Sequence, residues 1–457
     1  KLLVHFNGRL LISDDGGETW DQCYCDEDLE NDGVWSSRGF NEHCTVDATF
    51  LGDGRPLFSA GDTGTFVSVD QEGKAYEYVH PEISYYAVPS DDRIRDAESN
   101  TVHVRTGWHS GGADALFINY SDMIQKGFYG KLFQHLYDPE IGPITHDWYH
   151  PNEWFNITKT LPDLDHYIFG DFAFIDDETC LLSYIRYTGT VGGSGSVPEG
   201  YGVLKGEFQA FNGEEPVWTW TDWSDGLPEG DGRTTYVTQM LHSSYRGERI
   251  FLTAARGDVL GGGLYMLEGP NFNNWVEIIS ANVENTYWNQ YRDFRSLAQS
   301  ENGSWLYVGT RGFSSGIGGL LLCKDPSHAS DMSEWEILAN DPDNTVRPFR
   351  FYENLPFWSA DFLHWADPLS IDKKMTYVSS IAVDRDDRKV VYISLRDQGM
   401  SNRSGLWKYD GKSWSHLSPD QPFKGMGVSV LRINPLKPSQ LLVGTDGQGL
   451  YIGDIGE

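Results

Sequence analysis

Short runs of apolar residues, some continuous and some alternating with polar residues, recur along the chain, and glycine-rich segments separate them. Runs of this kind predict β-strands joined by tight turns. Four successive runs form one unit, and we name its predicted strands A, B, C and D in chain order. The clearest units comprise residues 236–241, 250–257, 263–266 and 275–278; 294–298, 305–312, 319–322 and 335–338; and 377–383, 390–396, 405–408 and 414–417. The sequence therefore predicts an all-β protein.

Weaker copies of the unit lie at residues 46–76 and 172–220, and a copy with long insertions lies between residues 100 and 154. The period varies from roughly 50 to 90 residues, because the turns vary in length far more than the strands. Four-stranded units that repeat in this way predict a β-propeller, in which sheets around an axis hide their edges by closing into a ring.

The two ends of the chain complete the predicted ring. The last unit has strands A, B and C at 427–433, 441–447 and 449–452, and it has no D strand. The first residues of the chain also read as short strands. We therefore expect a single domain over residues 1–457, with the ring closed where residues 1–25 meet residues 425–457. Counting this joint as one blade gives a seven-bladed propeller, and counting its two pieces separately gives eight blades.

Residues 13–20 form the clearest turn motif, Ser-x-Asp-x-Gly-x-Thr-Trp. Asp15 can accept backbone N–H groups across a hairpin turn, and Gly17 can adopt a positive φ. Trp20 opens the next strand with a large apolar side chain. Degenerate copies of the motif lie at residues 68–76 and 409–414.

With this motif, and with the segment 443–451 of the final unit, the chain resembles the Asp-box (BNR-type) β-propeller superfamily. That superfamily includes sialidases, xyloglucan-cleaving endoglucanases, sortilin-type receptors and photosystem assembly factors. The resemblance covers nearly the whole chain and implies the fold rather than an activity. It implies that Asp-box hairpins occupy the C–D turns on one face. Ligands are then expected on the opposite face, which the B–C turns and long D–A loops form.

The end of strand B therefore carries the first candidate site. Four units place an arginine there: Arg186, Arg256, Arg311 and Arg396. Guanidinium groups bind both oxygens of a carboxylate or sulfate in one plane, so these arginines are candidate ligands of an acidic sugar. The structural alternative is that each arginine pairs with an aspartate of the neighbouring blade, such as Asp258.

Carboxylates and tyrosines near the same face are the candidate catalytic groups. Glycoside hydrolysis uses two carboxyl groups about 5–10 Å apart, and sialidases are the exception with a tyrosine nucleophile. The candidates are Asp62, Asp258, Asp293, Asp397 and Tyr291. The strand A entries also hold Tyr167, Tyr236 and Tyr377, and anchoring of the core is the alternative role of all these tyrosines.

Two long D–A loops, residues 141–165 and 340–375, are rich in aromatic residues. Loops of this length are uncommon unless they have a function, and exposed aromatic rings stack on sugar faces. Trp358 and Trp365 are the candidate sugar-stacking residues. Packing of the aromatic residues on each other is the alternative. His109, in a glycine-rich segment, is a candidate proton carrier without a visible partner.

The composition of the chain excludes some classes of partner. The formal net charge of −32 argues against nucleic acid as a partner, because phosphate would be repelled. This charge suits a soluble, secreted protein, and halophilic adaptation is the alternative explanation.

No apolar run approaches the length of a membrane span. No motif implies a cofactor or a metal, and the spacing of the carboxylates does not support a calcium site. Cys180 and Cys323 fit buried thiols, whereas one disulfide among Cys23, Cys25 and Cys44 stays open.

We therefore expect a secreted, carbohydrate-active propeller, a glycoside hydrolase or polysaccharide lyase, whose partner is an extracellular polysaccharide, either acidic or neutral. The alternative is a non-catalytic binding or assembly propeller that recognises a protein or a glycan. The chain has no recognisable sialidase Phe-Arg-Ile-Pro segment, which argues against sialidase activity.

Overall fold

The computed structural model describes residues 1–6, 9–22, 25–27, 35–37, 45–50, 54–60, 64–68, 76–79, 93–96, 102–107, 115–120, 137–138, 142–143, 154–156, 160–161, 167–176, 178–188, 198–212, 215–229, 235–256, 263–272, 274–280, 293–312, 320–338, 376–397, 405–417, 428–445 and 449–455.

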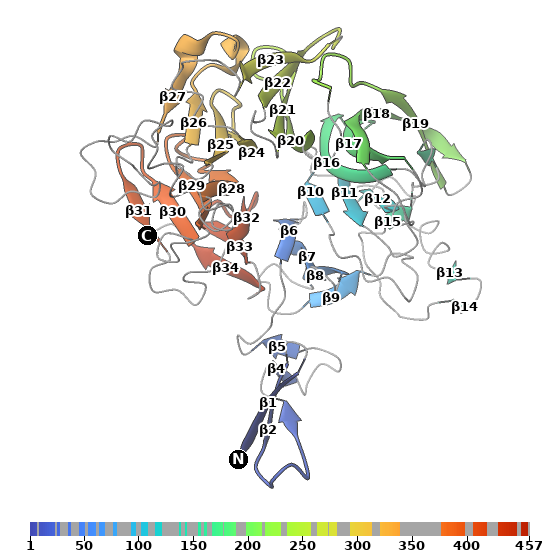
Figure 1. The fold of residues 1–457 in the computed structure, drawn as a ribbon, viewed down its shortest axis with the longest axis vertical. Coiled ribbons are helices and arrows are strands. Elements are labelled where there is room, and N and C mark those ends of the chain that lie inside the picture. The colour runs from blue at the N-terminus through green and yellow to red at the C-terminus, as the bar shows by residue number, and fades with distance from the viewer. Residues whose placement is uncertain are drawn as a thin grey trace, which may run out of the picture.

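Antiparallel sheets surround a common axis, and within each three- or four-stranded sheet the strands follow chain order (Figure 1). The first two sheets are β6 (Thr45–Phe50), β7 (Pro56–Ala60), β8 (Gly64–Ser68) and β9 (Tyr76–Val79), then β10 (Arg93–Asp96), β11 (Val102–Gly107), β12 (Ala115–Tyr120) and β15 (Trp154–Asn156). The next two are β16 (Tyr167–Asp176), β17 (Thr179–Tyr187), β18 (Pro198–Asn212) and β19 (Glu215–Asp222), then β20 (Thr235–Ser243), β21 (Arg249–Arg256), β22 (Gly263–Glu268) and β23 (Val276–Ser280).

The following two units join into one eight-stranded sheet, and the last sheet has three described strands. The eight strands are β24 (Asp293–Gln299), β25 (Leu306–Gly312), β26 (Leu320–Cys323), β27 (Trp335–Ile337), β28 (Thr376–Val383), β29 (Val391–Asp397), β30 (Gly405–Tyr409) and β31 (Trp414–His416). The last sheet comprises β32 (Val428–Ile433), β33 (Gln440–Thr445) and β34 (Leu450–Asp454).

A separate three-stranded sheet lies apart from the ring (Figure 1). It comprises β1 (Leu2–Phe6), β2 (Arg9–Ser13) and β3 (Asp21–Gln22). The smaller elements are the pairs β4 (Cys25–Glu27) with β5 (Trp35–Ser37) and β13 (Tyr137–Asp138) with β14 (Gly142–Pro143), and the 3-10 turns η6 (Pro326–His328) and η7 (Met332–Glu334). Among the described residues, no helix has the length and apolar character needed to cross a bilayer.

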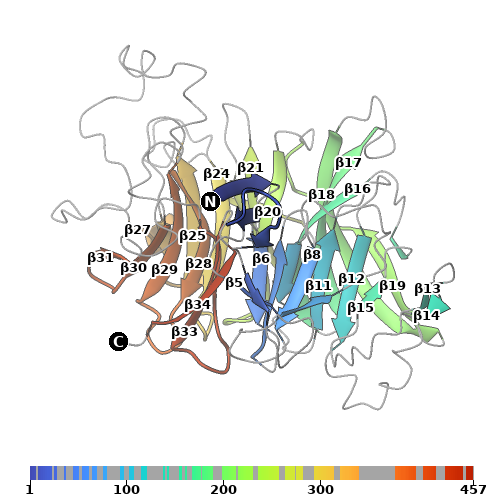
Figure 2. The same ribbon diagram turned by 90° about the horizontal axis from the view of Figure 1, so that it is seen from below.

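The first strand of each sheet lies innermost and contacts the first strand of the next sheet. These strands are β6, β10, β16, β20, β24, β28 and β32, and β32 contacts β6 in turn. Seen from the side, the sheets stand next to one another around the axis (Figure 2). A closed ring of twisted antiparallel sheets is the β-propeller architecture. The predicted all-β propeller is thus the observed fold.

The apolar joint that closes this ring lies between the first and last sheets. Ala48, Phe50 and Phe58 pack against Val430 and Leu442 in one buried cluster. We predicted that residues 1–25 would supply this joint. No described strand of residues 1–25 pairs with β34, and the buried contacts come from β6 and β7 instead.

The second strand of each sheet is the centre of the core. In β33 every residue is buried, and β21, β25 and β29 carry equally buried runs. Such a strand has partners on both edges and neighbouring sheets on both faces, which explains its continuous apolar sequence. Cys180 and Cys323 lie in these buried strand patterns as free thiols, as predicted, and burial raises the pKa of Cys323 to about 12.

The inner strands are tied to one another by polar side chains placed at a shared backbone irregularity. A β-bulge interrupts the pairing of β6, β16, β20, β24, β28 and β32 with the following strand. At the bulge of β20, Gln239 accepts a hydrogen bond from Leu297 N at 2.8 Å and donates to Leu297 O at 3.1 Å. At the bulge of β28, Ser380 Oγ accepts from Leu431 N at 3.0 Å. Bulges re-aim side chains, and here they direct polar groups toward the next blade.

The turn after β2 has the hydrogen bonds that its sequence predicts. Asp15 Oδ1 accepts from the backbone N of Glu18 and of Thr19, each at 3.0 Å, and Ser13 Oγ donates to it at 2.7 Å. Gly17 has φ of +100°. The turn after β30 repeats the pattern, since Asp410 Oδ1 accepts from two backbone N–H groups.

Hydrogen bonds from Thr19, first from its hydroxyl and then from its N–H, hold the pKa of Asp15 well below its usual range. A depressed pKa means that the stabilisation is complete above the ordinary value of about 3.9 and is lost as the pH falls below it. We expect opening of this turn to increase by up to about tenfold per pH unit in that acidic range.

Amide hydrogen exchange at Glu18 and Thr19, followed from pH 5 downward, measures this effect. Asp15→Asn should show a flatter pH dependence, because its amide oxygen accepts without titrating. Asp14→Asn is the matched control, since Asp14 instead pairs with Lys1 at 2.9 Å. A pH dependence equal in wild type and Asp15→Asn would contradict the assignment.

Candidate functional site

The ends of the second strands and the starts of the first strands meet on one face of the ring. Backbone pairing places Tyr167 opposite Arg186 and Thr235 opposite Arg256. The next two units place Asp293 opposite Arg311 and Tyr377 opposite Arg396. Counted from the β-bulge of the first strand, Arg311 and Arg396 share one register position, whereas Arg186 and Arg256 lie one residue farther from the bulge. The four arginines therefore lie near the same end of their strands but do not share one position.

Four residues at the ends of neighbouring strands form a continuous row across the eight-stranded sheet. Asp293 of β24 pairs with Arg311 of β25, and Arg311 also pairs with Tyr377 of β28. Tyr377 in turn pairs with Arg396 of β29. The fold thus gathers a carboxylate residue, two arginines and a tyrosine, taken from two units, into one register row.

The sequence around Arg311 explains how two units join here. β26 pairs with β25 only as far as Gly309, which leaves the edge of β25 beyond that residue available to β28. A Cβ on Gly309 would lie 2.1 Å from Ser296 Oγ and 2.8 Å from Val378 Cβ. Glycine at this position therefore allows the two inner strands to approach the end of β25 closely.

Arg186 is the arginine whose side chain the structure describes. Its half-exposed guanidinium Nε lies 3.0 Å from Glu199 Oε1 on the adjacent strand β18. An exposed pair of this kind contributes little to stability, about 0–1 kcal/mol. It nevertheless gives Arg186 a carboxylate partner within its own sheet, and not the aspartate of a neighbouring blade that the structural alternative expects.

The predicted catalytic residues are only partly placed by the structure. Asp397 ends β29 opposite Thr376, one register position from the row that begins at Asp293. Three strand spacings separate the strands of these two aspartates, about 14 Å. That backbone separation exceeds the 5–10 Å expected between two catalytic carboxyl groups. Asp62, Asp258, Tyr291, Trp358, Trp365 and His109 lie outside the described residues.

Asp171 has a structural role that sequence reasoning missed. It lies fully buried at the bulge of β16, where its Oδ2 accepts from Met240 N of the next inner strand. Its own N–H donates to Ser183 Oγ at 2.7 Å. The polar residues at the equivalent bulges were the signal in the sequence, because they recur in otherwise apolar strands.

Within the described part of the chain, no group of three or more His, Cys, Asp or Glu residues is arranged to hold a metal ion. Arginine is a residue type whose guanidinium group binds anions, and carboxylates and phenols are groups that can transfer protons.

Comparisons with known proteins agree with the fold. No family model matches the sequence, and no curated protein matches it. A GH74 enzyme from Niastella koreensis is similar in structure, with a TM-score of 0.52, 11% identity, and coverage of 91% of this chain and 53% of that one. The chain thus spans about half the length of that enzyme.

Two further solved structures give lower scores. YCF48 bound to D1 peptide has a TM-score of 0.48 at 10% identity, covering 91% of this chain and 95% of that one. The extracellular domain of BT4673 from B. thetaiotaomicron has a TM-score of 0.48 at 11% identity, covering 99% of this chain and 52% of that one. At 11% identity, the similarity to the GH74 enzyme supports the fold and shows no activity.

Proposed function

We propose that this chain is a secreted, seven-bladed Asp-box propeller that cleaves an extracellular acidic polysaccharide, as a glycoside hydrolase or a polysaccharide lyase. The row Asp293, Arg311, Tyr377 and Arg396 carries the proposal, because backbone pairing brings two arginines into one register with an aspartate and a tyrosine. The inner strands β6, β10, β16, β20, β24, β28 and β32 would each begin one blade.

In this proposal Arg311 and Arg396 hold the carboxylate or sulfate of the sugar. Two arginines on either side of Tyr377 suit such a group, because a planar fork binds two oxygens at once. Asp293 would accept or donate the proton, and the neighbouring positive charge would favour its ionised form. Because the net charge is −32, the rest of the protein would repel an acidic substrate. Binding of such a substrate would therefore depend on these arginines.

The structural similarity to a GH74 enzyme supports a hydrolase only through the shared fold. A non-catalytic binding propeller is the second candidate. The ion pair between Arg186 and Glu199 favours it, because an arginine already paired within its own sheet is less available to a ligand.

The two candidates differ in turnover. We expect wild-type protein to release reducing ends or unsaturated products from at least one acidic polysaccharide in a panel that also contains neutral polysaccharides. Reducing-end and ultraviolet assays separate hydrolysis from elimination. Binding of a polysaccharide without product, measured by calorimetry, would replace the enzyme with the binding propeller. The absence of both binding and turnover would reject both candidates.

A further inference from the structure

The inner strand β28 pairs on both of its edges, with β25 on one side and with β29 on the other. Every other inner strand in the described part of the ring pairs only with the second strand of its own sheet. On β28, Tyr377 pairs with Arg311 and also with Arg396. Residues directly opposite each other in antiparallel strands have Cα atoms about 4.5–5.5 Å apart. The backbone thus brings Tyr377 next to two arginines at once.

The other units, as far as their strands are described, do not repeat this arrangement. Tyr167 pairs with one arginine, Arg186, which forms its ion pair with Glu199 of β18. In β20, Thr235 takes the place opposite Arg256. The arrangement around Tyr377 therefore comes from the joining of two units at the end of β25, which the early end of the β26 pairing makes possible.

The aspartates near this row suit hydrolysis poorly, and elimination matches the row better. The strands of Asp293 and Asp397 lie about 14 Å apart, whereas hydrolysis uses two carboxyl groups about 5–10 Å apart. Elimination from a uronic acid needs positive charge at the sugar carboxylate, because that charge stabilises the negative charge that develops on C5 of the ring. It also needs one group that transfers a proton. The row around Tyr377 contains both kinds of residue.

We infer that this enzyme is a lyase of uronic acid polysaccharides and that Tyr377 transfers the proton, an inference that rests on the proposed function. Arg311 and Arg396 would bind the uronate carboxylate. The phenolate of Tyr377 would then take the hydrogen from C5, and the electrons of that C–H bond would form a double bond to C4. The bond from C4 to the glycosidic oxygen breaks, and Tyr377 returns the proton to that oxygen. The cleavage consumes no water and no oxidant.

Tyr377 suits this step better than Asp293 does. Tyr377 pairs with both arginines, whereas Asp293 pairs only with Arg311 and lies at the end of the row. Two strand spacings, about 10 Å, separate the strands of Asp293 and Tyr377. A carboxylate held by both arginines would therefore place its sugar ring nearer to Tyr377.

This mechanism limits the substrates in two ways. The acidic group must be a carboxylate on C5, because a sulfate ester is attached through oxygen and does not stabilise negative charge on C5. A single phenol can serve both the C5 hydrogen and the C4 oxygen only when they lie on the same side of the ring. Glucuronate and mannuronate meet this condition, whereas in galacturonate the two atoms lie on opposite sides. We therefore expect a polymer of the first kind to be the substrate.

Polymannuronate, polyglucuronate and polygalacturonate, each also with its carboxyl groups reduced to alcohols, are the test substrates. The full chain should convert polymannuronate or polyglucuronate into products that absorb in the ultraviolet, with one new reducing end for each double bond. The carboxyl-reduced polymers should give neither signal.

Two variants test the role of Tyr377. Tyr377→Phe should lower kcat by about a hundredfold to ten-thousandfold, the usual contribution of a proton-transferring group, while calorimetry shows polymer binding within threefold of wild type. Tyr245→Phe is the matched control, because Tyr245 lies in the turn between β20 and β21, at the other end of the strands. Its kcat should stay within twofold of wild type.

The outcomes separate this inference from the proposed function. Reducing ends without ultraviolet absorbance would show hydrolysis, which overturns the inference and leaves the proposed function standing. Cleavage of polygalacturonate alone, or a wild-type rate for Tyr377→Phe, would overturn the assignment of Tyr377. No product from any acidic polysaccharide would reject the proposed function itself.

Discussion

Replacing Arg311 by alanine is expected to lower kcat/KM on the acidic polysaccharide about a hundredfold. Arg311 occupies the middle of the register row, between Asp293 and Tyr377. A charge-assisted, two-pronged bond to a carboxylate or sulfate contributes about 3 kcal/mol, which corresponds to about a hundredfold in affinity or rate. The measurement is initial rate against substrate concentration on the polysaccharide that wild type cleaves.

Two variants separate a specific role of Arg311 from a general effect of charge. Arg311→Lys keeps the charge and loses the planar fork, so we expect an intermediate loss of about tenfold. Arg246→Ala removes an exposed arginine from the turn between β20 and β21, at the other end of the strands, where it pairs with Asp325 at 2.8 Å. Its rate should stay within twofold of wild type. Equal rates for Arg311→Ala and wild type would remove this row from the proposed active site.

The four-strand repeat, and the face of the ring on which the second strands end, were predictable from the sequence because both depend on local patterns. A strand buried on both faces must be apolar throughout, so β21, β25, β29 and β33 were visible as continuous runs. The position of Arg311 at the end of such a run then fixed its place relative to the sheet. Its pairing with Tyr377 of the next unit was not predictable, because it depends on where β26 ends.

The ring closure and the links between blades depend on contacts between distant residues. We expected residues 1–25 at the joint because they read as strands, yet strand character does not specify a partner. The apolar cluster of Phe50 and Leu442 forms the joint instead. Likewise, the sequence shows Asp171 as one acidic residue among many. Its role follows only from a bulge that points it at the next blade.

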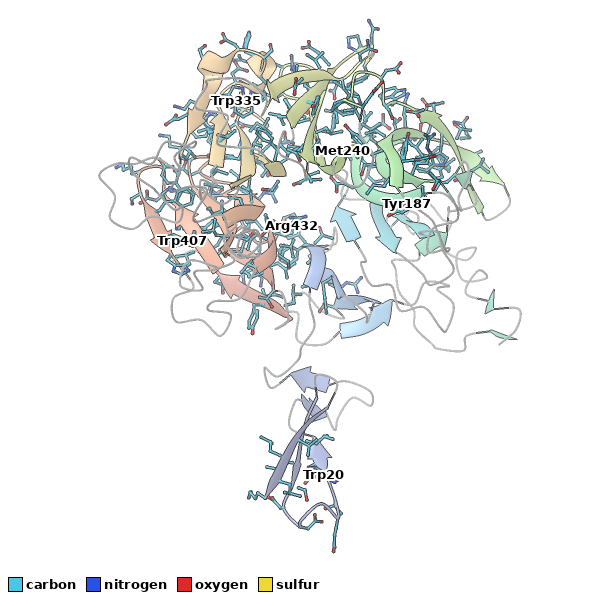
Figure 3. The ribbon with its side chains drawn as sticks, in the orientation of Figure 1. Trp20, Tyr187, Met240, Trp335, Trp407 and Arg432 are labelled. Carbon is cyan, nitrogen blue, oxygen red and sulfur yellow. The ribbon has the colours of Figure 1, made fainter. Side chains whose placement is uncertain are left out.

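Replacing Asp171 by alanine is expected to reduce the free energy of unfolding by about 2–4 kcal/mol. The substitution would leave the buried Met240 N–H without its carboxylate acceptor, and losing a charged partner costs more than losing a neutral one. Both residues lie on inner strands, and Figure 3 shows Met240 close to the axis of the ring. Asp171→Asn keeps an acceptor oxygen, so its loss should be smaller.

Ser380→Ala is the matched control for this effect, because Ser380 has the same position at the bulge of β28. Its neutral hydroxyl accepts from Leu431 N at 3.0 Å, so we expect a loss of only about 1 kcal/mol. Urea titration with fluorescence and circular dichroism would give both values, provided that the two probes report coincident transitions. If Asp171→Ala were no more destabilised than Ser380→Ala, the buried carboxylate would have no special part in joining β16 to β20. A larger loss for Asp171→Ala than for Ser380→Ala would show that Asp171 forms the stronger of these two polar links between neighbouring blades.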